Sequence, residues 1–276
     1  MIPAAFEYLR ADSADDAIAA LSEHGDEAKL LAGGHSLVPM MKLRLATPSV
    51  VVDVGRADDL RYVRDGGDHV AVGALTRHRE LETSDVLAEH APLVAHVASL
   101  VGDPAVRHFG TIGGSIAHAD PASDLPAAAL ALGATLVATG PNGEREVPVA
   151  EFFTGYFQSV LAHDEMLTEV RLPKMGGAGW SFQKFNRRAQ DWAIVAVAAV
   201  HGNGAGTGVG LVNMGSTPLR AEATESAVAA GASAAAAGAL AADGTEPPSD
   251  LNGDATYRRA LAAVLTTRAL TAAGVA

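Results

Sequence analysis

A pair of adjacent glycines between an apolar run and donor-bearing residues constrains this chain more than any other feature. Residues 30–39 read Leu-Leu-Ala-Gly-Gly-His-Ser-Leu-Val-Pro. Glycine tolerates positive φ and, without a Cβ, lets backbone N–H groups approach a ligand closely. Ser36 is placed to N-cap a helix over residues 37–45, and a helix N-terminus favours an anion. The stretch predicts either an ordinary strand-to-helix turn or a phosphate-binding turn, and it lacks the Gly-x-Gly-x-x-Gly fingerprint of dinucleotide sites.

A second glycine pair follows at residues 113–114, within the stretch Gly-Thr-Ile-Gly-Gly-Ser-Ile-Ala-His-Ala-Asp-Pro-Ala-Ser-Asp-Leu-Pro of residues 110–126. Both pairs have a hydroxyl residue within two positions, so two backbone loops can face one polyanionic ligand. Asp124 precedes Leu-Pro, which predicts that it N-caps a helix over residues 125–132. A cap and a ligand contact do not exclude each other, and two unrelated turns remain the alternative.

The order of predicted elements divides the chain into three units of α+β character. The first unit, residues 1–57, has a helix at 13–24 and strands at 28–32 and 49–54. The second, residues 58–173, is predicted to hold a hairpin turning at 65–68, helices at 76–81 and 91–101, and strands at 135–139 and 169–173. Glycine-rich residues 174–179 have linker composition. The third, residues 178–276, is predicted to hold strands at 180–185, 192–200 and 208–214, a turn at 203–206, and helices at 221–242 and 255–273.

Composition excludes several classes of protein. The 276 residues are 49% hydrophobic, which suits a packed core, and the net charge of -12 argues against a nucleic-acid partner. No apolar run reaches the ~18–20 residues that span a bilayer, and no secretory signal is visible, so we expect a cytoplasmic protein. The absence of cysteine excludes disulfides and a thiolate-held iron–sulfur cluster in this polypeptide. No histidine pair has helical zinc-site spacing with a third ligand, so no metal centre is expected.

Taken together, the motifs resemble a known family. The residues that carry the resemblance are 32–39, 73–76, 111–115, 120–126 and 184–193. In this order they are similar to the FAD-binding medium subunit of molybdenum hydroxylases, of the aerobic carbon monoxide dehydrogenase type and related to the FAD domain of xanthine dehydrogenase. The resemblance covers essentially the whole chain. It implies a two-subdomain FAD-binding domain of the vanillyl-alcohol-oxidase (PCMH) type, followed by a smaller α+β C-terminal domain with an antiparallel sheet and helices.

The resemblance also implies which residues hold the cofactor. The residues expected around the FAD diphosphate are Ala32, Gly33, Gly34, His35, Ser36, Leu37, Thr111, Ile112, Gly113, Gly114 and Ser115. By the same match, Asp124 reaches the ribityl or flavin part, Leu167 packs against the ring system and Lys184 lies near the flavin. The alternative is that Asp124 is only a helix cap, Leu167 only a strand core residue and Lys184 only a solvated lysine. No catalytic residue is expected, because the flavin relays electrons in such subunits, and His35 is expected to orient the loop or touch the phosphate.

The function that the resemblance implies is electron transfer within a larger complex. Substrate would be oxidised in a molybdenum-cofactor large subunit, electrons would pass through an iron–sulfur small subunit, and FAD in this chain would deliver them to an external acceptor. A heterohexamer is the expected assembly. Carbon monoxide, aldehydes and purines or other N-heterocycles remain open as substrates, and quinone, NAD and oxygen as acceptors. The alternatives are a stand-alone flavoenzyme that acts on a small substrate, or a non-catalytic assembly subunit.

Overall fold

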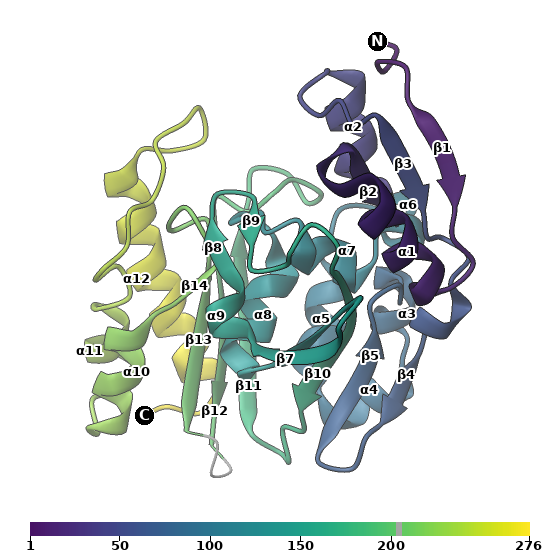
Figure 1. Cartoon of the computed structure of the whole chain (residues 1–276). Helices are drawn as coiled ribbons and strands as arrows, with labels where there is room; N and C mark the ends of the chain where they lie inside the picture. Colours follow the sequence, from purple (N-terminus) through teal and green to yellow (C-terminus); the bar gives the residue numbers. More distant parts are fainter. Residues whose placement is uncertain (203–205) are drawn as a thin grey trace.

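The described residues form three larger β-sheets, a two-stranded sheet and the helices between them (Figure 1). This computed structural model describes residues 1–202 and 206–276, so three residues of the turn predicted at 203–206 lie outside the described residues. The combination of helices with a parallel and several antiparallel sheets confirms the α+β class.

The N-terminal unit is a three-stranded parallel sheet in the order β1-β3-β2. Its elements are β1 (Glu7–Arg10), α1 (Ala14–His24), β2 (Ala28–Leu31), α2 (Leu37–Lys42) and β3 (Val50–Asp53). Helix α1 begins where predicted, because the Ser13 side chain accepts a hydrogen bond from the Asp16 N–H. Its buried residues Ile18 and Leu21 pack with Val50 and Val52. Strand β2 ends at Leu31, one residue before the first glycine pair.

The second unit contains a five-stranded antiparallel sheet in the order β4-β5-β10-β6-β7. The strands of this unit are β4 (Val63–Asp65), β5 (His69–Gly73), β6 (Thr135–Gly140), β7 (Gly143–Pro148) and β10 (Met166–Pro173), with a separate hairpin of β8 (Phe153–Gly155) and β9 (Gln158–Ser159). Its helices are α3 (His78–Glu82), α4 (Asp85–His90), α5 (Pro92–Ser99), α6 (Pro104–Phe109), α7 (Ile112–Ala117), α8 (Asp124–Leu132) and α9 (Val149–Phe152). The predicted hairpin around residues 65–68 is present as β4 and β5.

The C-terminal unit is a four-stranded antiparallel sheet with helices on one face. Its elements are β11 (Gly179–Phe185), β12 (Val195–His201), β13 (Thr207–Val212), β14 (Leu219–Arg220), α10 (Glu222–Ala229), α11 (Ala234–Gly238) and α12 (Ala255–Ala272). Strand β12 alternates its side chains between two cores. Val195 and Val197 pack with Leu265 of α12, whereas Ala196 and Ala198 pack in the core that contains α5 and α8.

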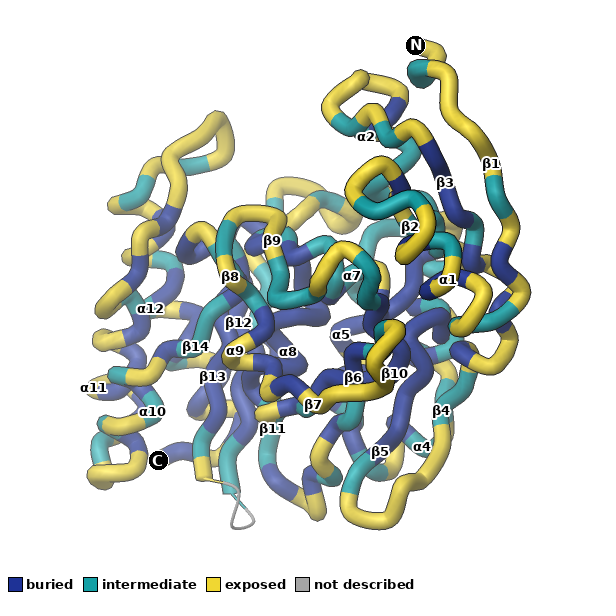
Figure 2. Tube along the Cα trace, viewed as in Figure 1, coloured by how far each residue is buried: buried dark blue, intermediate teal, exposed yellow. Residues whose placement is uncertain are grey.

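Helix α8 joins the second unit to the C-terminal sheet. Figure 2 shows buried backbone concentrated where α5, α8 and β12 meet. Along β13, a Cβ on Gly208 would lie 1.9 Å from the Ala131 carbonyl oxygen, and one on Gly210 would lie 2.0 Å from that of Ala127. Glycine at these positions allows α8 to lie directly against the strand, so the two units share one packed core.

The long Ala-rich helix predicted over residues 221–242 is wrong, because the structure divides it into α10 and α11. Gly231 adopts a φ of +88° between them, and the Ser233 side chain accepts a hydrogen bond from the Ala236 N–H to begin α11. A glycine at positive φ ends a helix, and alanine content alone does not continue it.

Candidate functional site

The two glycine pairs, at residues 33–34 and 113–114, lie in loops that touch each other. A Cβ on Gly33 would lie 2.2 Å from the Phe109 carbonyl oxygen and 2.8 Å from the Gly110 Cα. A Cβ on Gly114 would lie 3.9 Å from the Ala32 Cβ. The loop after β2 and the loop before α7 are therefore in contact, and the structure brings the two predicted motifs into one site.

The first glycine loop presents unused backbone donors. In the described chain, the N–H groups of Gly33, Gly34, His35 and Ser36 donate no hydrogen bond to protein. Gly34 has a φ of +73°, which a residue with a Cβ rarely adopts. Successive N–H groups around a residue at positive φ form a concave site for an anion. This loop thus has the donor arrangement that a phosphate group requires.

The second glycine loop uses most of its donors internally. The N–H groups of Ile112 and Gly113 donate to the carbonyls of Thr76 and Ala74 at 3.0 and 2.8 Å. The Gly114 N–H donates to the Thr111 hydroxyl at 3.1 Å, which caps helix α7. These residues therefore form a short helix and not a loop. Both backbone groups of Gly114 are used within it, because its carbonyl accepts a hydrogen bond from the His118 N–H, so the half-buried Ser115 supplies the group that remains for a ligand, its hydroxyl.

Ser36 occupies the N-cap position of α2 as predicted, but the expected capping by its side chain is wrong. Ser36 adopts helical φ and ψ of −100° and −52°, its side chain makes no capping hydrogen bond, and α2 ends at Lys42 rather than at residue 45. Val38 N–H donates to the Gly34 carbonyl instead. The glycine loop itself therefore begins α2, and the Ser36 hydroxyl makes no hydrogen bond with any residue that the structure describes.

Asp124 does not N-cap its helix. Ser123 occupies that position, and Asp124 is the first residue of α8, with its side chain turned toward Lys184 of β11. Asp124 Oδ2 lies 2.6 Å from Lys184 Nζ, which also donates to the Leu100 carbonyl at 3.1 Å. Both side chains are less than a tenth exposed, so Lys184 is not a solvated lysine. Burial raises the pKa of Asp124, and Lys184 opposes that shift.

One oxygen of Asp124 has no partner. Its Oδ1 is buried and accepts no hydrogen bond in the described chain. A buried carboxylate oxygen without a donor is costly, and native structures seldom leave one unless a ligand or water supplies the donor. Asp124 therefore marks a position at which a hydroxyl or N–H of a bound molecule fits.

Leu167 is separate from these polar groups. Its side chain is 4% exposed and packs in the core of the second unit with Val170 and Leu172. It does not line either of the two hollows described next. The structure thus gives Leu167 the position of a strand core residue, and it does not bring its side chain to the glycine loops.

Two hollows adjoin the glycine loops. The smaller, of about 40 Å³, is lined by Gly33, Phe109 and Thr111 and is large enough for water. The larger, of about 430 Å³, is lined by Leu30 and Ala117 at the edges of the two loops and by polar residues such as Glu165. Its size falls in the range of sites for small organic ligands.

His78 supports the second glycine loop. Its backbone N–H donates to the Gly110 carbonyl at 2.9 Å, and its ring lies 2.7 Å from the Cβ position of that glycine. Burial lowers the pKa of His78 to about 4, with charges on His35 and Arg107 adding to the shift. No sequence signal identifies His78, because it lies in an ordinary short helix.

His35 is exposed on the first glycine loop. Its ring packs edge-on against the Phe109 ring at a centroid distance of 6.0 Å, and Arg77 lies over the Phe109 ring at 5.8 Å. This aromatic contact joins the two glycine loops a second time. The arrangement agrees with a loop-shaping role for His35.

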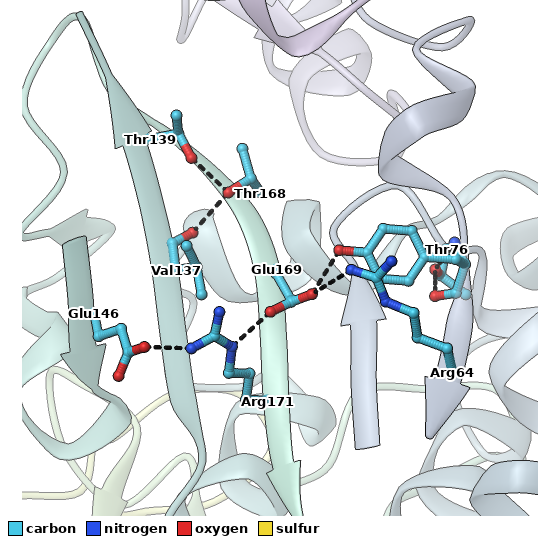
Figure 3. A network of polar contacts seen from close by, with 9 residues as sticks. Arg64, Thr76, Val137, Thr139, Glu146, Thr168, Glu169 and Arg171 are labelled. Atoms are coloured by element: carbon cyan, nitrogen blue, oxygen red, sulfur yellow. Dashed lines mark hydrogen bonds and ion pairs between the residues drawn. The ribbon is translucent and has the colours of Figure 1, made fainter. Parts of the chain in front are cut away.

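A second polar cluster crosses the five-stranded sheet and has a different character (Figure 3). Glu169 of β10 accepts hydrogen bonds from the Tyr62 hydroxyl at 2.7 Å and from Arg171 Nε at 2.6 Å, and it pairs with Arg64 at 3.3 Å. Arg171 also pairs with Glu146. Both carboxylate oxygens of Glu169 are used, so this cluster holds strands together and offers no free group to a ligand.

Two kinds of site are not found in the described part of the chain. Residues 1–202 and 206–276 contain no group of three or more His, Asp or Glu side chains placed to hold a metal ion. Within the same residues, no helix is long and apolar enough to cross a membrane.

Comparison with known proteins identifies relatives along the whole chain. Residues 4–175 match the family model described as "FAD binding domain in molybdopterin dehydrogenase", and residues 180–273 match "CO dehydrogenase flavoprotein C-terminal domain". The chain is 42% identical to the carbon monoxide dehydrogenase medium chain of Hydrogenophaga pseudoflava, covering 99% of this chain and 98% of that protein. It is 36% identical to the glyceraldehyde dehydrogenase medium chain of Sulfolobus acidocaldarius, covering 98% of each. A solved structure of carbon monoxide dehydrogenase from H. pseudoflava superposes with a TM-score of 0.94 at 43% identity, covering 99% of this chain and 98% of the other.

Proposed function

Because the chain belongs to the family of FAD-binding subunits of molybdopterin dehydrogenases, we propose that it relays electrons through an FAD held at its two glycine loops. It is an FAD-dependent oxidoreductase subunit of the molybdenum hydroxylase type. When bound, FAD supplies the redox chemistry, and the polypeptide supplies binding, orientation and electrostatic tuning.

The observation that carries the proposal is the run of free N–H groups at residues 33–36. A diphosphate is a polyanion with several acceptor oxygens, and the unused donors of Gly33, Gly34, His35 and Ser36 match that need. Ala32 and Leu37 bound this run. The second loop touches the first where Gly114 faces Ala32 and where Phe109 and Gly110 face Gly33. We assign residues 111–115 to the same diphosphate, to which the Ser115 hydroxyl adds a donor.

The residues around the loops fit the remainder of the cofactor. The partnerless Oδ1 of Asp124 is an acceptor for a hydroxyl group, of which FAD carries several. We assign Lys184 to the same end of the site, because it is bonded to Asp124. The larger hollow beside Leu30 and Ala117 is assigned to the adenosine part, and Leu167, a core residue of β10, is given no contact with the cofactor.

The chain's partners follow from the same reasoning. It contains no cysteine, so the iron–sulfur clusters that feed the flavin belong to another polypeptide. We propose a small iron–sulfur subunit and a large molybdenum-cofactor subunit, assembled with this chain as a heterohexamer. The names of the relatives support a medium-chain role and differ in substrate, carbon monoxide in one and glyceraldehyde in another. Substrate choice is accordingly assigned to the large subunit.

A pair of glycine variants tests the proposal. Gly34→Val places a Cβ at positive φ in the donor loop, whereas Gly67→Val does so in the β4–β5 turn, where a Cβ would meet nothing within 4 Å. Both variants carry the backbone strain of positive φ, and only the first alters the donors. Titration of the purified full chain with FAD, followed by flavin fluorescence, is expected to show binding by wild type and G67V and its loss in G34V. Equal FAD affinity in a folded G34V would contradict the proposal.

A further inference from the structure

The buried pair of Asp124 and Lys184 joins two parts of the chain that the family models treat separately. Asp124 begins α8 within residues 4–175, and Lys184 lies on β11 within residues 180–273. The two atoms that pair, Oδ2 and Nζ, are 2.6 Å apart. The acidic half of the pair thus belongs to the FAD-binding domain, and the basic half belongs to the C-terminal domain.

The hydrogen bonds of Lys184 direct it at Asp124. Its Nζ donates to Asp124 at the start of α8 and to the carbonyl of Leu100, the residue that follows α5. Two acceptors fix the direction of the ammonium group, and its side chain is only 8% exposed. Lys184 therefore holds Oδ2 in place and leaves Oδ1 free.

The backbone around Asp124 is also held by the C-terminal domain. The Asn213 N–H donates to the Pro121 carbonyl at 2.7 Å, three residues before Asp124. Gly210 of β13 lies directly against Ala127 in the first turns of α8. Residues 121–127, which include Asp124, are therefore held at both ends by β13 and the residue after it, in the sheet that also contains Lys184.

The charge state of Asp124 depends on this contact. Burial favours the neutral acid, and, among the described residues, Lys184 is the charged group that acts on Asp124 and opposes that tendency. A carboxylate accepts a hydrogen bond on each oxygen, whereas the neutral acid carries a proton that competes for the same position. Removal of the Lys184 ammonium group therefore favours the neutral acid, whose proton competes with a ligand's donor for the carboxyl oxygens.

We infer that Lys184 is a positioning residue that acts through Asp124, keeping it an ionised acceptor with Oδ1 free for the cofactor, so that the C-terminal domain takes part in retaining FAD. The inference rests on the proposed binding of FAD at Asp124. It assigns to Lys184 an action on the carboxylate and not on the cofactor itself.

A double-mutant cycle on the full chain tests the inference, with FAD dissociation constants measured by flavin fluorescence. Asp124→Asn and Lys184→Met are each expected to weaken FAD binding about tenfold, the effect of one hydrogen bond to a charged group. Lys184→Arg, which keeps the positive charge, is expected to restore most of the affinity. In the Asp124→Asn background, Lys184→Met is expected to have less than about a twofold further effect, since the group through which it acts is gone.

The pH profile supplies a readout that a merely structural role would not move. Without Lys184 the pKa of Asp124 rises further, so the pH below which FAD affinity falls is expected to shift upward in K184M relative to wild type. An unchanged profile, or an equal loss from K184M in both backgrounds, would overturn the inference. K184M alone leaves a buried carboxylate without its partner and could fail to fold, whereas the double variant D124N/K184M removes both buried charges. The double variant can therefore still be compared with D124N.

The outcomes separate this inference from the proposed function. Failure of the folded wild-type chain to bind FAD would contradict the proposed function itself. Binding by wild type together with undiminished binding by D124N would leave the proposed function standing and would overturn the role of Lys184.

Discussion

The carbonyl oxygen of Phe109 occupies the space in which Gly33 would carry a Cβ, at 2.2 Å from its ideal position. The loop that follows β2 and the junction between α6 and α7 therefore pack backbone against backbone. Glycine at position 33 is needed for this contact, and its backbone does not adopt positive φ. The contact sets the distance between the two loops that we assign to the FAD diphosphate.

Gly33→Ala is expected to lower the free energy of unfolding by about 2–4 kcal/mol, because the added methyl group meets immobile backbone. It is also expected to weaken FAD binding by moving the loops apart. Urea unfolding and FAD titration measure the two effects. Gly67→Ala is the control, since it carries only the strain of positive φ, about 1 kcal/mol. A G33A chain as stable as G67A would show that the loops tolerate separation.

The pH dependence of stability is expected to contain a contribution from His78. Its folded pKa of about 4 lies below the ordinary value of 6.5, so the unfolded chain binds the proton first as pH falls. This stability is present above pH 6.5 and is lost between pH 6.5 and 4. Between pH 7 and 5 the loss is about 2 kcal/mol, from the 1.36 kcal/mol that one pKa unit represents. His78→Gln is expected to flatten this part of the urea-unfolding profile, and an equally steep profile in the variant would contradict the assignment.

The buried Arg258 of α12 is expected to give an asymmetric pair of variants. It is fully buried, bonds the Ile194 carbonyl and pairs with the part-exposed Asp250 at 2.7 Å. Asp250→Ala leaves a buried cation without its partner and is expected to cost about 3 kcal/mol, whereas Arg258→Met leaves only a solvated carboxylate and is expected to cost less. Chemical denaturation of D250A and R258M measures the loss of unfolding free energy in each variant. The opposite order would show that Asp250 contributes little to holding Arg258.

The Tyr62–Glu169 hydrogen bond is expected to stabilise the central sheet without affecting the cofactor. Tyr62→Phe removes a donor to a carboxylate, which typically costs about 1.5–3 kcal/mol, while Arg171 continues to bond Glu169. Urea unfolding measures the loss, and FAD titration of the same variant is expected to give the wild-type affinity. A loss of affinity in Y62F would mean that the sheet network acts on the glycine loops.

The sequence predicts the elements that neighbouring residues determine, and it does not predict contacts between residues far apart in the chain. The strand before Gly33, the helix capped by Ser13 and the β4–β5 hairpin follow from local patterns, and the structure contains all three. The pairing of Asp124 with Lys184 joins residues 60 apart, and no local pattern places them together. Asp124 was read as a helix cap because Asp before Leu-Pro favours one, but tertiary pairing with a buried lysine competes for the same carboxylate.

The short helix α7 escaped prediction for a related reason. Gly113 and Gly114 have low helix propensity, and the segment was read as a loop. Its helical form is imposed from outside, since Ile112 and Gly113 donate to the carbonyls of Thr76 and Ala74. A Cβ on Gly113 would lie 2.5 Å from the Ala74 Cβ, so the glycine that weakens the helix also lets it pack.

The central claim, that the two glycine loops hold the diphosphate of FAD, is tested most directly by comparing FAD with FMN, which carries the same flavin on a single phosphate. Titration of the purified full chain is expected to show FAD binding with a stoichiometry near one. FMN is expected to bind at least about tenfold more weakly, because it cannot use all of the free N–H groups at residues 33–36. A folded chain that binds no FAD, or that binds FMN as tightly as FAD, would contradict the account.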